Sequence, residues 1–272
     1  MKIENVIKKF NQEKIYLCPK CLSESCIENI SLVCSNNHHR YDFSKKGYIH
    51  LINNYKPTKY SEELFKARSE VFGNDFYANV LKNIQNLVEK YAEDVVLDIG
   101  CGEGYYIKKL KEVFPEKYFY GLDNSKDAIE LAVKEDKLNP YMVANLANLP
   151  FKDGSVSCIL NILTPANYEE FFRVLGDEGY LIKVIPNANY LREIRELIGG
   201  KEYTNSDTVS LIEENCTIVE RITVSDTFRL TQMQAASFLK MTPLTFSKVI
   251  TDADIEKLKE ITIDLELLVC KR

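Results

Sequence analysis

The chain has 272 residues, of which 45% are hydrophobic and 28% are charged. These are ordinary values for a globular protein, and the length allows one large domain plus a smaller unit. No apolar run approaches the roughly 20 residues that span a bilayer, and the N-terminal stretch MKIENVIKKFNQEK lacks the apolar core of a signal peptide. We therefore expect a cytoplasmic protein with no membrane partner.

The charge is unevenly distributed along the chain. The formal net charge is −5, yet residues 1–60 hold ten Lys or Arg and five acids, which leaves a net charge of −10 on the other 212 residues. A basic front on an acidic body is one pattern of a nucleic-acid-binding module. A solvated lysine-rich surface explains the same split, so charge alone leaves both interpretations open.

Four cysteines and two histidines are concentrated in residues 18–42. In a protein that is not exported, disulfides are rare and clustered cysteines indicate a metal. The spacing of a structural zinc site is met by Cys18, Cys21, Cys34 and either His38 or His39. Three thiolates and one imidazole leave no open position on the metal, and zinc supplies folding energy to a segment too small for its own core. Cys26 lies between these ligands and is expected to be a bystander.

The chain beyond this cluster divides into a helical connection and a long α/β region. Short strands are expected at 30–34 and 48–52, and helical periodicity is found at 63–72 and 76–91. Further on, strands are expected at 95–99, 118–122, 140–144, 156–163 and 179–185, and helices at 104–114, 125–136 and 167–175. The tail has β-rich runs at 217–225 and 261–270.

This alternation of strands and helices predicts an α/β fold with a doubly wound, mainly parallel sheet. We expect a small zinc-binding, β-rich unit at 1–55, a helical linker at 56–92 and the sheet domain at 93–272.

A glycine-rich turn follows the first strand of the sheet domain, in 95-VVLDIGCGEGYY-106. Glycines at such a turn let a ligand approach the backbone at a helix N-terminus, although a tight turn needs glycine for steric reasons as well. Asp123 ends the next strand, 19 residues after Gly104. An acid at this place is positioned to accept hydrogen bonds from two ribose hydroxyls.

The turn resembles the first motif of class I S-adenosylmethionine-dependent methyltransferases. The motif is carried by Asp98, Gly100, Gly102 and Gly104. The dinucleotide fingerprint G-x-G-x-x-G fails because its third glycine would fall on Tyr105. The stretch 143-VANLANLPFKDGSVSCIL-160 resembles the adenine-binding segment of the same superfamily, with Asn145 at a position that is usually acidic. The resemblance implies a Rossmann-like fold and S-adenosylmethionine as cofactor.

The Cys/His cluster and this motif together resemble the bacterial 23S ribosomal RNA (guanine-N1)-methyltransferase family, whose members carry a zinc ribbon before a class I domain. The similar stretches are 39-HRYDFSKKGYIHLI-52, Ala67–Arg68, 98-DIGCGEGYY-106, 120-YGLDNSKDAI-129 and 241-MTPLTF-246. The resemblance implies His39 as the fourth zinc ligand and methylation of guanine N1 in a hairpin of large-subunit rRNA. By position, the family's cofactor contacts fall on Tyr77, Gly102, Glu103 and Tyr190.

Three stretches depart from the pattern of that family, in its linker, after its Ala-Arg helix and before its fifth strand. They read 57-PTKYSEEL-64, Arg68-Ser69 and 177-DEGY-180. The departures leave the cofactor motifs intact and bear on the target base and on activity. Two alternatives stay open: a methyltransferase acting on a small molecule or protein, and a non-catalytic RNA-binding relative. A homodimer is open as well.

The catalytic residue is not assigned by the sequence. All three histidines lie in the first fifty residues, so the sheet domain offers no histidine base unless His50 folds back onto it. A carboxylate, a tyrosine or water is then expected to remove the guanine N1 proton. Covalent methylation of a pyrimidine needs a cysteine nucleophile, and the loop 161-NILTPANY-168 has none.

Overall fold

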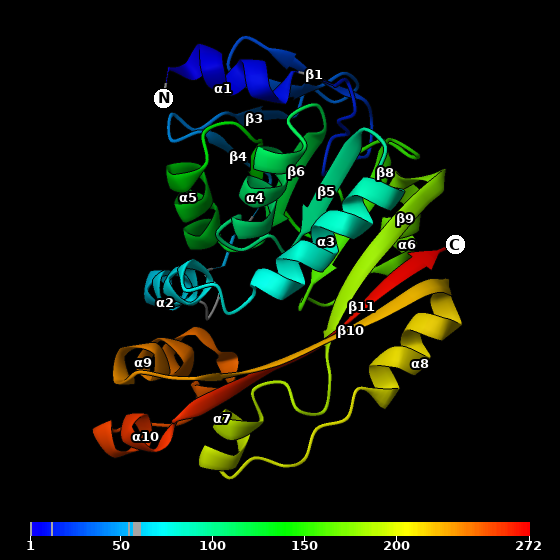
Figure 1. Cartoon of the computed structure of the whole chain (residues 1–272). Coiled ribbons are helices and arrows are strands. Elements are labelled where there is room, and N and C mark those ends of the chain that lie inside the picture. Colours follow the sequence, from blue (N-terminus) through cyan, green and yellow to red (C-terminus); the bar gives the residue numbers. More distant parts are fainter. Residues whose placement is uncertain (1, 12, 54, 57–60) are drawn as a thin grey trace.

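A single mixed sheet of eight strands forms the centre of the molecule in the computed structural model, which describes residues 2–11, 13–53, 55–56 and 61–272 (Figure 1). Residues 57–60 of the linker departure lie outside the described part. In spatial order the strands are β10 (Thr217–Arg229), β11 (Glu260–Lys271), β9 (Leu175–Pro186), β8 (Val156–Ile162), β5 (Val95–Ile99), β6 (Tyr118–Asp123), β7 (Tyr141–Val143) and β4 (Tyr48–His50).

The sheet is parallel from β9 to β4, and β11 and β10 close the other edge as antiparallel strands. This arrangement confirms the predicted α/β fold. Helices pack on both faces: α1 (Ile3–Phe10), α3 (Ala78–Tyr91), α4 (Tyr105–Val113), α5 (Lys126–Glu135), α6 (Tyr168–Val174) and α8 (Ser206–Asn215).

The core has two layers because every residue of the central strand β5 is buried. Val96 packs into the layer under α3 and α4, whereas Leu97 packs into the layer that α1 and α6 cover. Side chains of successive strand residues point to opposite faces. A strand that is apolar throughout therefore belongs in the middle of a sheet with helices on both sides.

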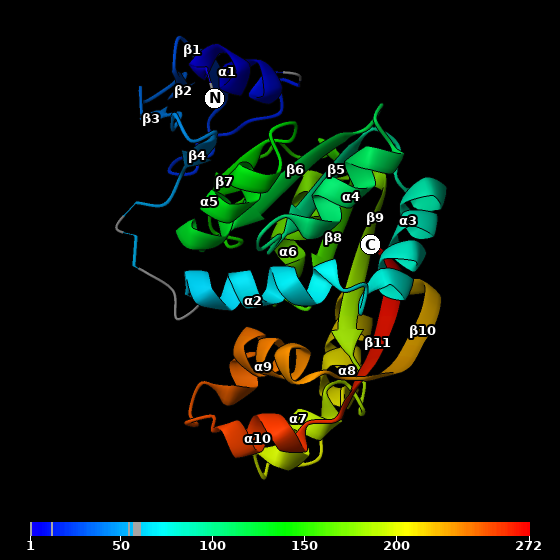
Figure 2. The same ribbon diagram turned by 60° about the vertical axis from the view of Figure 1, so that its left-hand side comes forward.

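The N-terminal part is attached to the edge of this sheet. A small antiparallel sheet is formed by β1 (Ser25–Glu28), β2 (Ser31–Cys34) and β3 (Arg40–Asp42). The next strand, β4, pairs in parallel with β7 (Figure 2). Phe10 and Tyr16 share a core layer with residues of the main sheet. The limits 1–55, 56–92 and 93–272 stay a prediction about the units of the chain.

A layer of helices lies beyond the carboxyl ends of the parallel strands. It contains α2 (Glu62–Gly73), α7 (Arg192–Leu197), α9 (Gln232–Met241), the 3-10 turn η1 (Pro243–Thr245) and α10 (Asp252–Lys257). Figure 2 shows α2 crossing below the strand ends, with α9, α10 and α7 further out. Within the described ranges, no helix is both long and apolar enough to cross a membrane.

Candidate functional site

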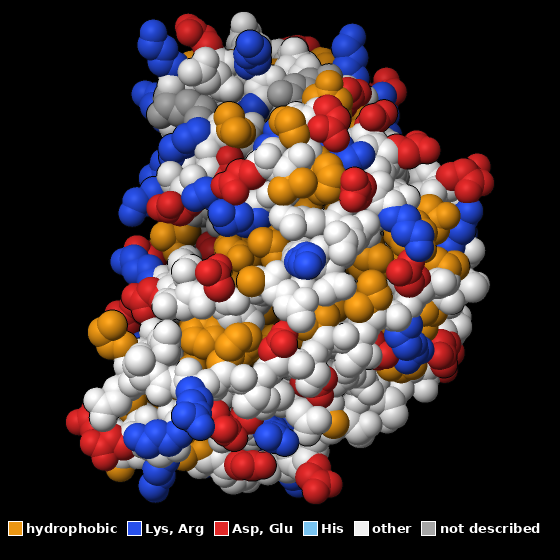
Figure 3. All heavy atoms as spheres, viewed as in Figure 1, with side chains coloured by type: hydrophobic (Ala, Val, Ile, Leu, Met, Phe, Trp, Pro, Cys, Tyr) orange, Lys and Arg blue, Asp and Glu red, His pale blue; other side chains and the backbone are white. Residues whose placement is uncertain are grey.

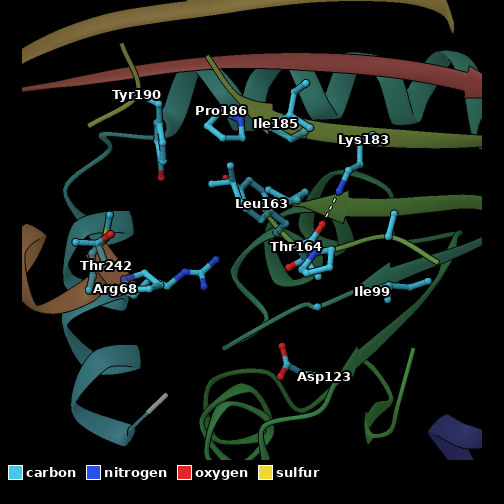
Figure 4. Close-up of a pocket in the computed structure, with 18 of the residues that line it drawn as sticks. Arg68, Ile99, Asp123, Leu163, Thr164, Lys183, Ile185, Pro186, Tyr190 and Thr242 are labelled. Atoms are coloured by element: carbon cyan, nitrogen blue, oxygen red, sulfur yellow. Dashed lines mark hydrogen bonds between the residues drawn. The ribbon is translucent and has the colours of Figure 1, made fainter. Parts of the chain in front are cut away.

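A cavity of about 820 Å³ lies between the carboxyl ends of the parallel strands and the outer helices (Figure 4). The ends of β5, β6, β8 and β9 form one wall, and α2 and the segment around η1 form the opposite wall. Ligands of open α/β sheets bind at this edge. Four of the residues predicted for cofactor binding line the cavity: Tyr77, Gly100, Asp123 and Tyr190.

The glycine turn after β5 needs its glycines for conformation and for space. Gly100, Gly102 and Gly104 have φ values of +80°, +54° and +77°, which side chains with a Cβ rarely adopt. A Cβ on Gly100 would lie 2.5 Å from Oγ1 of Thr164, and one on Gly104 would lie 2.6 Å from the hydroxyl of Tyr141. The turn is therefore packed so closely that larger residues would displace its neighbours.

Asp123 connects this turn to the next strand. One carboxylate oxygen accepts a hydrogen bond from the backbone N–H of Gly102 at 2.9 Å, and the other accepts one from Ser125 at 2.7 Å. Each carboxylate oxygen has two lone pairs. The side chain can thus hold the turn and still accept ribose hydroxyls from the cavity.

Two buried acids, Asp98 and Glu103, and the half-buried Asp123 lie near one arginine, Arg68, at this end of the cavity. Asp98 is buried and, among the residues described, neither of its oxygens has a hydrogen-bond donor. Glu103 is also buried, with Oε1 at 3.6 Å from Nε of Arg68. Burial, and next the Asp123 carboxylate, raises the pKa of Asp98 to about 8. Burial also raises the pKa of Glu103 and of Asp123.

Buried polar atoms without partners, such as the two carboxyl oxygens of Asp98, are costly. Asp98 and Glu103 are not among the residues that line the cavity, but a cofactor with an ammonium or sulfonium group bound next to the glycine turn would offset their burial.

Two tyrosines from distant parts of the chain meet at the far side of the cavity. The hydroxyls of Tyr77, before α3, and Tyr190, after β9, lie 2.8 Å apart. Asn145 is different: it is exposed, does not line the cavity, and accepts a hydrogen bond from the backbone of Ala147.

Sequence reasoning gave no role to three basic residues of the cavity wall, Arg195, Arg68 and Lys183. Arg68, on α2, belongs to the stretch Ala67–Arg68 that resembles the family, and the resemblance gave it no role. Lys183 lies in the apolar run 179-GYLIKVI-185 of β9, and a lysine inside a buried strand is itself a signal. Arg68 and Lys183 reach the cavity from opposite walls in Figure 4.

A second cluster brings together the sulfur and nitrogen atoms of Cys18, Cys21, Cys34 and His39 within 4.8 Å of one another. Nδ1 of His39 lies 3.3 Å from Sγ of Cys18 and 3.7 Å from Sγ of Cys21, and Sγ of Cys21 lies 3.5 Å from Sγ of Cys34. Ligands of a tetrahedral zinc, at about 2.3 Å for sulfur, are separated by roughly 3.8 Å. His38 and Cys26 are both exposed.

The fold and the cavity are those of a methyltransferase. A family model described as a methyltransferase domain matches residues 97–182. In three dimensions the chain is similar to a geranyl diphosphate methyltransferase solved in complex with SAM, with a TM-score of 0.50 and 13% identity over 75% of this chain and 89% of that one. This likeness supports the fold alone.

Comparison with known sequences identifies the family within this class of enzymes. YxjB of Bacillus subtilis (strain 168), a 23S rRNA (guanine-N(1)-)-methyltransferase by assignment, is 31% identical over 94% of this chain and 96% of the relative. The 23S rRNA (guanine(748)-N(1))-methyltransferase of Streptomyces fradiae is 28% identical over 67% of each chain. The chain belongs to the 23S rRNA (guanine-N1)-methyltransferase family, and this membership confirms the resemblance drawn from the sequence.

Proposed function

We propose that this protein transfers a methyl group from S-adenosylmethionine to N1 of a guanine in a hairpin of 23S rRNA, and that its N-terminal unit is a zinc ribbon that holds the RNA. The observation that carries the proposal is the similarity to YxjB, because it extends over 94% of the chain and thus includes both the Cys/His cluster and the cavity.

The cavity supports the cofactor part of the proposal. Asp123 would hold the ribose, and the turn with Gly100, Gly102 and Gly104 would lie against the cofactor backbone. Asp98 and Glu103 place two buried carboxyl groups near this turn, and the two tyrosines, Tyr77 and Tyr190, close the far side. S-adenosylmethionine supplies a methyl group on a positively charged sulfur, so the protein's task is to position the acceptor and exclude water.

The Cys/His cluster supports zinc as the second cofactor. Four soft or borderline ligands with tetrahedral spacing fit a closed structural site. We propose Cys18, Cys21, Cys34 and His39 as the ligands.

A groove between the N-terminal unit and α5 supports an RNA surface next to the ribbon. It has a volume of about 490 Å³ and is lined by Lys45, Lys46, Lys134 and Lys137, together with acids of α2 and α5. Figure 3 shows Lys and Arg side chains along the left margin of the molecule, over the N-terminal unit and α5. Lysines that contact phosphates release counterions and give affinity without base specificity.

The substrate base must leave its stack to reach the cavity, since the methyl donor would be held inside it. Ribosomal RNA of bacteria lies in the cytoplasm, and we propose that location for the protein. A homodimer stays a prediction.

The test is methyl transfer by the purified protein from labelled S-adenosylmethionine to a 23S rRNA fragment, followed by nucleoside mass spectrometry. We expect 1-methylguanosine. Methylation of a small molecule with none of RNA would favour the small-molecule alternative. Tight RNA binding without cofactor binding or transfer would favour the non-catalytic alternative.

A further inference from the structure

Lys183 is a buried amine on the cavity wall to which the cofactor assignment gives no role. It lies on β9 with 5% of its surface exposed and lines the cavity. Its neighbour in the sheet register is Asn161 of β8. An ammonium in such a place is costly unless an anion pairs with it, and in the described part of the chain no carboxylate forms an ion pair with Lys183.

The hydrogen bonds of Lys183 suit a neutral amine. Nζ donates to Oδ1 of Asn161 and to the backbone carbonyl of Thr164 (Figure 4). The amide nitrogen of Asn161 donates to the carbonyls of Ile99 at 3.1 Å and Pro165 at 3.3 Å, so its oxygen faces the lysine. A neutral amine has two N–H bonds and one lone pair. Two uncharged acceptors therefore satisfy its donors and leave the lone pair available.

The surroundings of Lys183 carry little charge. From β8 and the following loop it faces Asn161 and Thr164, which do not titrate in this range. From β11 it faces the thiol of Cys270, which shares a hydrogen bond with the thiol of Cys216. Burial lowers the pKa of Lys183 to about 8, against a smaller raising effect of Cys270.

Lys183 also lies on the side of the cavity that the cofactor leaves for the acceptor. The glycine turn and Asp123 are at the ends of β5 and β6. The loop that accepts the lysine's hydrogen bond touches this turn, because a Cβ on Gly100 would lie 2.5 Å from Oγ1 of Thr164. The ends of β8 and β9, next to that loop, are then the place for the target base.

We propose that Lys183 is the catalytic base that takes the N1 proton from the target guanine. This inference rests on the proposed function. The N1–H bond breaks, its proton goes to the lysine lone pair, and its electrons stay on N1. That electron pair forms the bond to the methyl carbon, and the carbon–sulfur bond breaks with its electrons going to sulfur. The products are N1-methylguanine, the neutral thioether and a lysine ammonium, which returns its proton to solvent.

The first experiment measures single-turnover methyl transfer to a 23S rRNA hairpin between pH 6 and pH 10, roughly two units either side of the lysine pKa. The wild-type rate should rise with pH and level off above about pH 8, where the amine is neutral. The methyl-transfer rate of Lys183→Met should be lower by roughly 100-fold or more, which is the range for loss of a general base. Its rate should not level off above pH 8. Lys9→Met is the matched control: Lys9 is equally buried with its pKa also lowered to about 8, but it lies outside the cavity. Its pH profile should keep the wild-type shape.

A second variant keeps the amine and changes its charge state. Asn161→Asp places a carboxylate beside Nζ, which stabilises the ammonium, so the inflection of the rate should move to higher pH. A lysine that only supports the loop would leave the inflection in place. Binding of S-adenosylhomocysteine, measured by calorimetry, checks that both variants retain the cofactor site.

The outcomes separate this proposal from the function on which it rests. If the wild type makes 1-methylguanosine and Lys183→Met does so at a similar rate with the same pH profile, Lys183 is not the base. An unmoved inflection in Asn161→Asp overturns the base role in the same way. If the wild type transfers no methyl group to RNA, the proposed function fails and this inference falls with it.

Discussion

Among single side chains, Asp98 is expected to make the stability of the protein depend on pH. Its pKa is raised to about 8, chiefly by burial, so the folded protein holds a proton that the unfolded chain releases above about pH 4. The folded state then binds more protons between these pH values, and the free energy of unfolding falls as pH rises through this window, by up to about 1.4 kcal/mol per pH unit. Asp98→Asn should flatten this slope.

The measurement is urea unfolding of wild type and Asp98→Asn without cofactor from pH 5 to pH 8. The variant should keep a smaller slope, because burial also raises the pKa of Glu103 and Asp123. Parallel curves for the two proteins would contradict the protonated state of Asp98.

Asp123 should contribute strongly to the affinity for S-adenosylmethionine. Removing a carboxylate that accepts two ribose hydrogen bonds costs about 1.5–3 kcal/mol, so Asp123→Ala should weaken binding of S-adenosylmethionine by that free energy in calorimetry. Asp127→Ala is the matched control, because Asp127 is an exposed acid in the first turn of α5, four residues further on. Equal affinities in all three proteins would remove Asp123 from the cofactor site.

Local motifs predicted the residues of the glycine turn and the acid that holds it, and of these Gly100 and Asp123 line the cavity. Asp98, the three glycines and Asp123 could be predicted because strand, turn and acid follow one another within 26 residues of sequence. Lys183 and Arg68 could not, since β9 and α2 meet at the cavity only through tertiary packing. The bases expected from the sequence were a carboxylate, a tyrosine or water, and a lysine was not among them.

At the level of strands and helices, we predict that the small sheet β1–β2–β3 depends on a zinc ion bound by Cys18, Cys21, Cys34 and His39. Cys34→Ser should lose the zinc, and residues 13–45 should become sensitive to protease, because zinc supplies the folding energy of such a unit. Cys26→Ser is the control, since Cys26 is exposed and its thiol points to Glu28. We expect one zinc per chain in wild type and control. Full zinc occupancy in Cys34→Ser, or a folded ribbon without zinc, would contradict the site.

The sequence predicted the bounds of some strands accurately and missed other strands. β5, β6 and β8 are apolar runs between turns and were found within one residue of their observed bounds. β1 and β3 were missed, because they are short and polar and lie beside the cluster that holds them. β9 starts at Leu175, directly after α6, four residues before the strand expected at 179–185. Helix α1 was missed although Ile3, Val6, Ile7 and Phe10 follow helical spacing.

At the scale of the whole molecule, the difference in charge between residues 1–60 and the rest of the chain should be measurable as a salt dependence of RNA binding. Lys45 is exposed, whereas the Lys46 ammonium already binds Glu130 at 2.7 Å. Lys45→Ala should therefore lower the slope of log affinity against log salt by about one unit for rRNA-hairpin binding. Lys46→Ala should lower it less. Lys82→Ala, an exposed lysine of α3, is the control with the same change in net charge.

Cofactor affinity should be unchanged in these variants, because their side chains lie outside the cavity. A salt slope that is equal in Lys45→Ala, Lys82→Ala and wild type would move the RNA surface away from the N-terminal unit.

The pairing of β4 with β7 has a consequence for which base is chosen. Tyr48, Ile49 and His50 continue the main sheet in register with 141–143, so the unit that would hold RNA phosphates is joined to the sheet whose strand ends form a wall of the cavity. We therefore expect the distance between the N-terminal unit and the cavity to be fixed. In that case, the guanine at this distance from the bound RNA backbone would be the one that enters the cavity. Lengthening the RNA stem by one base pair would present a different nucleotide to the same cavity.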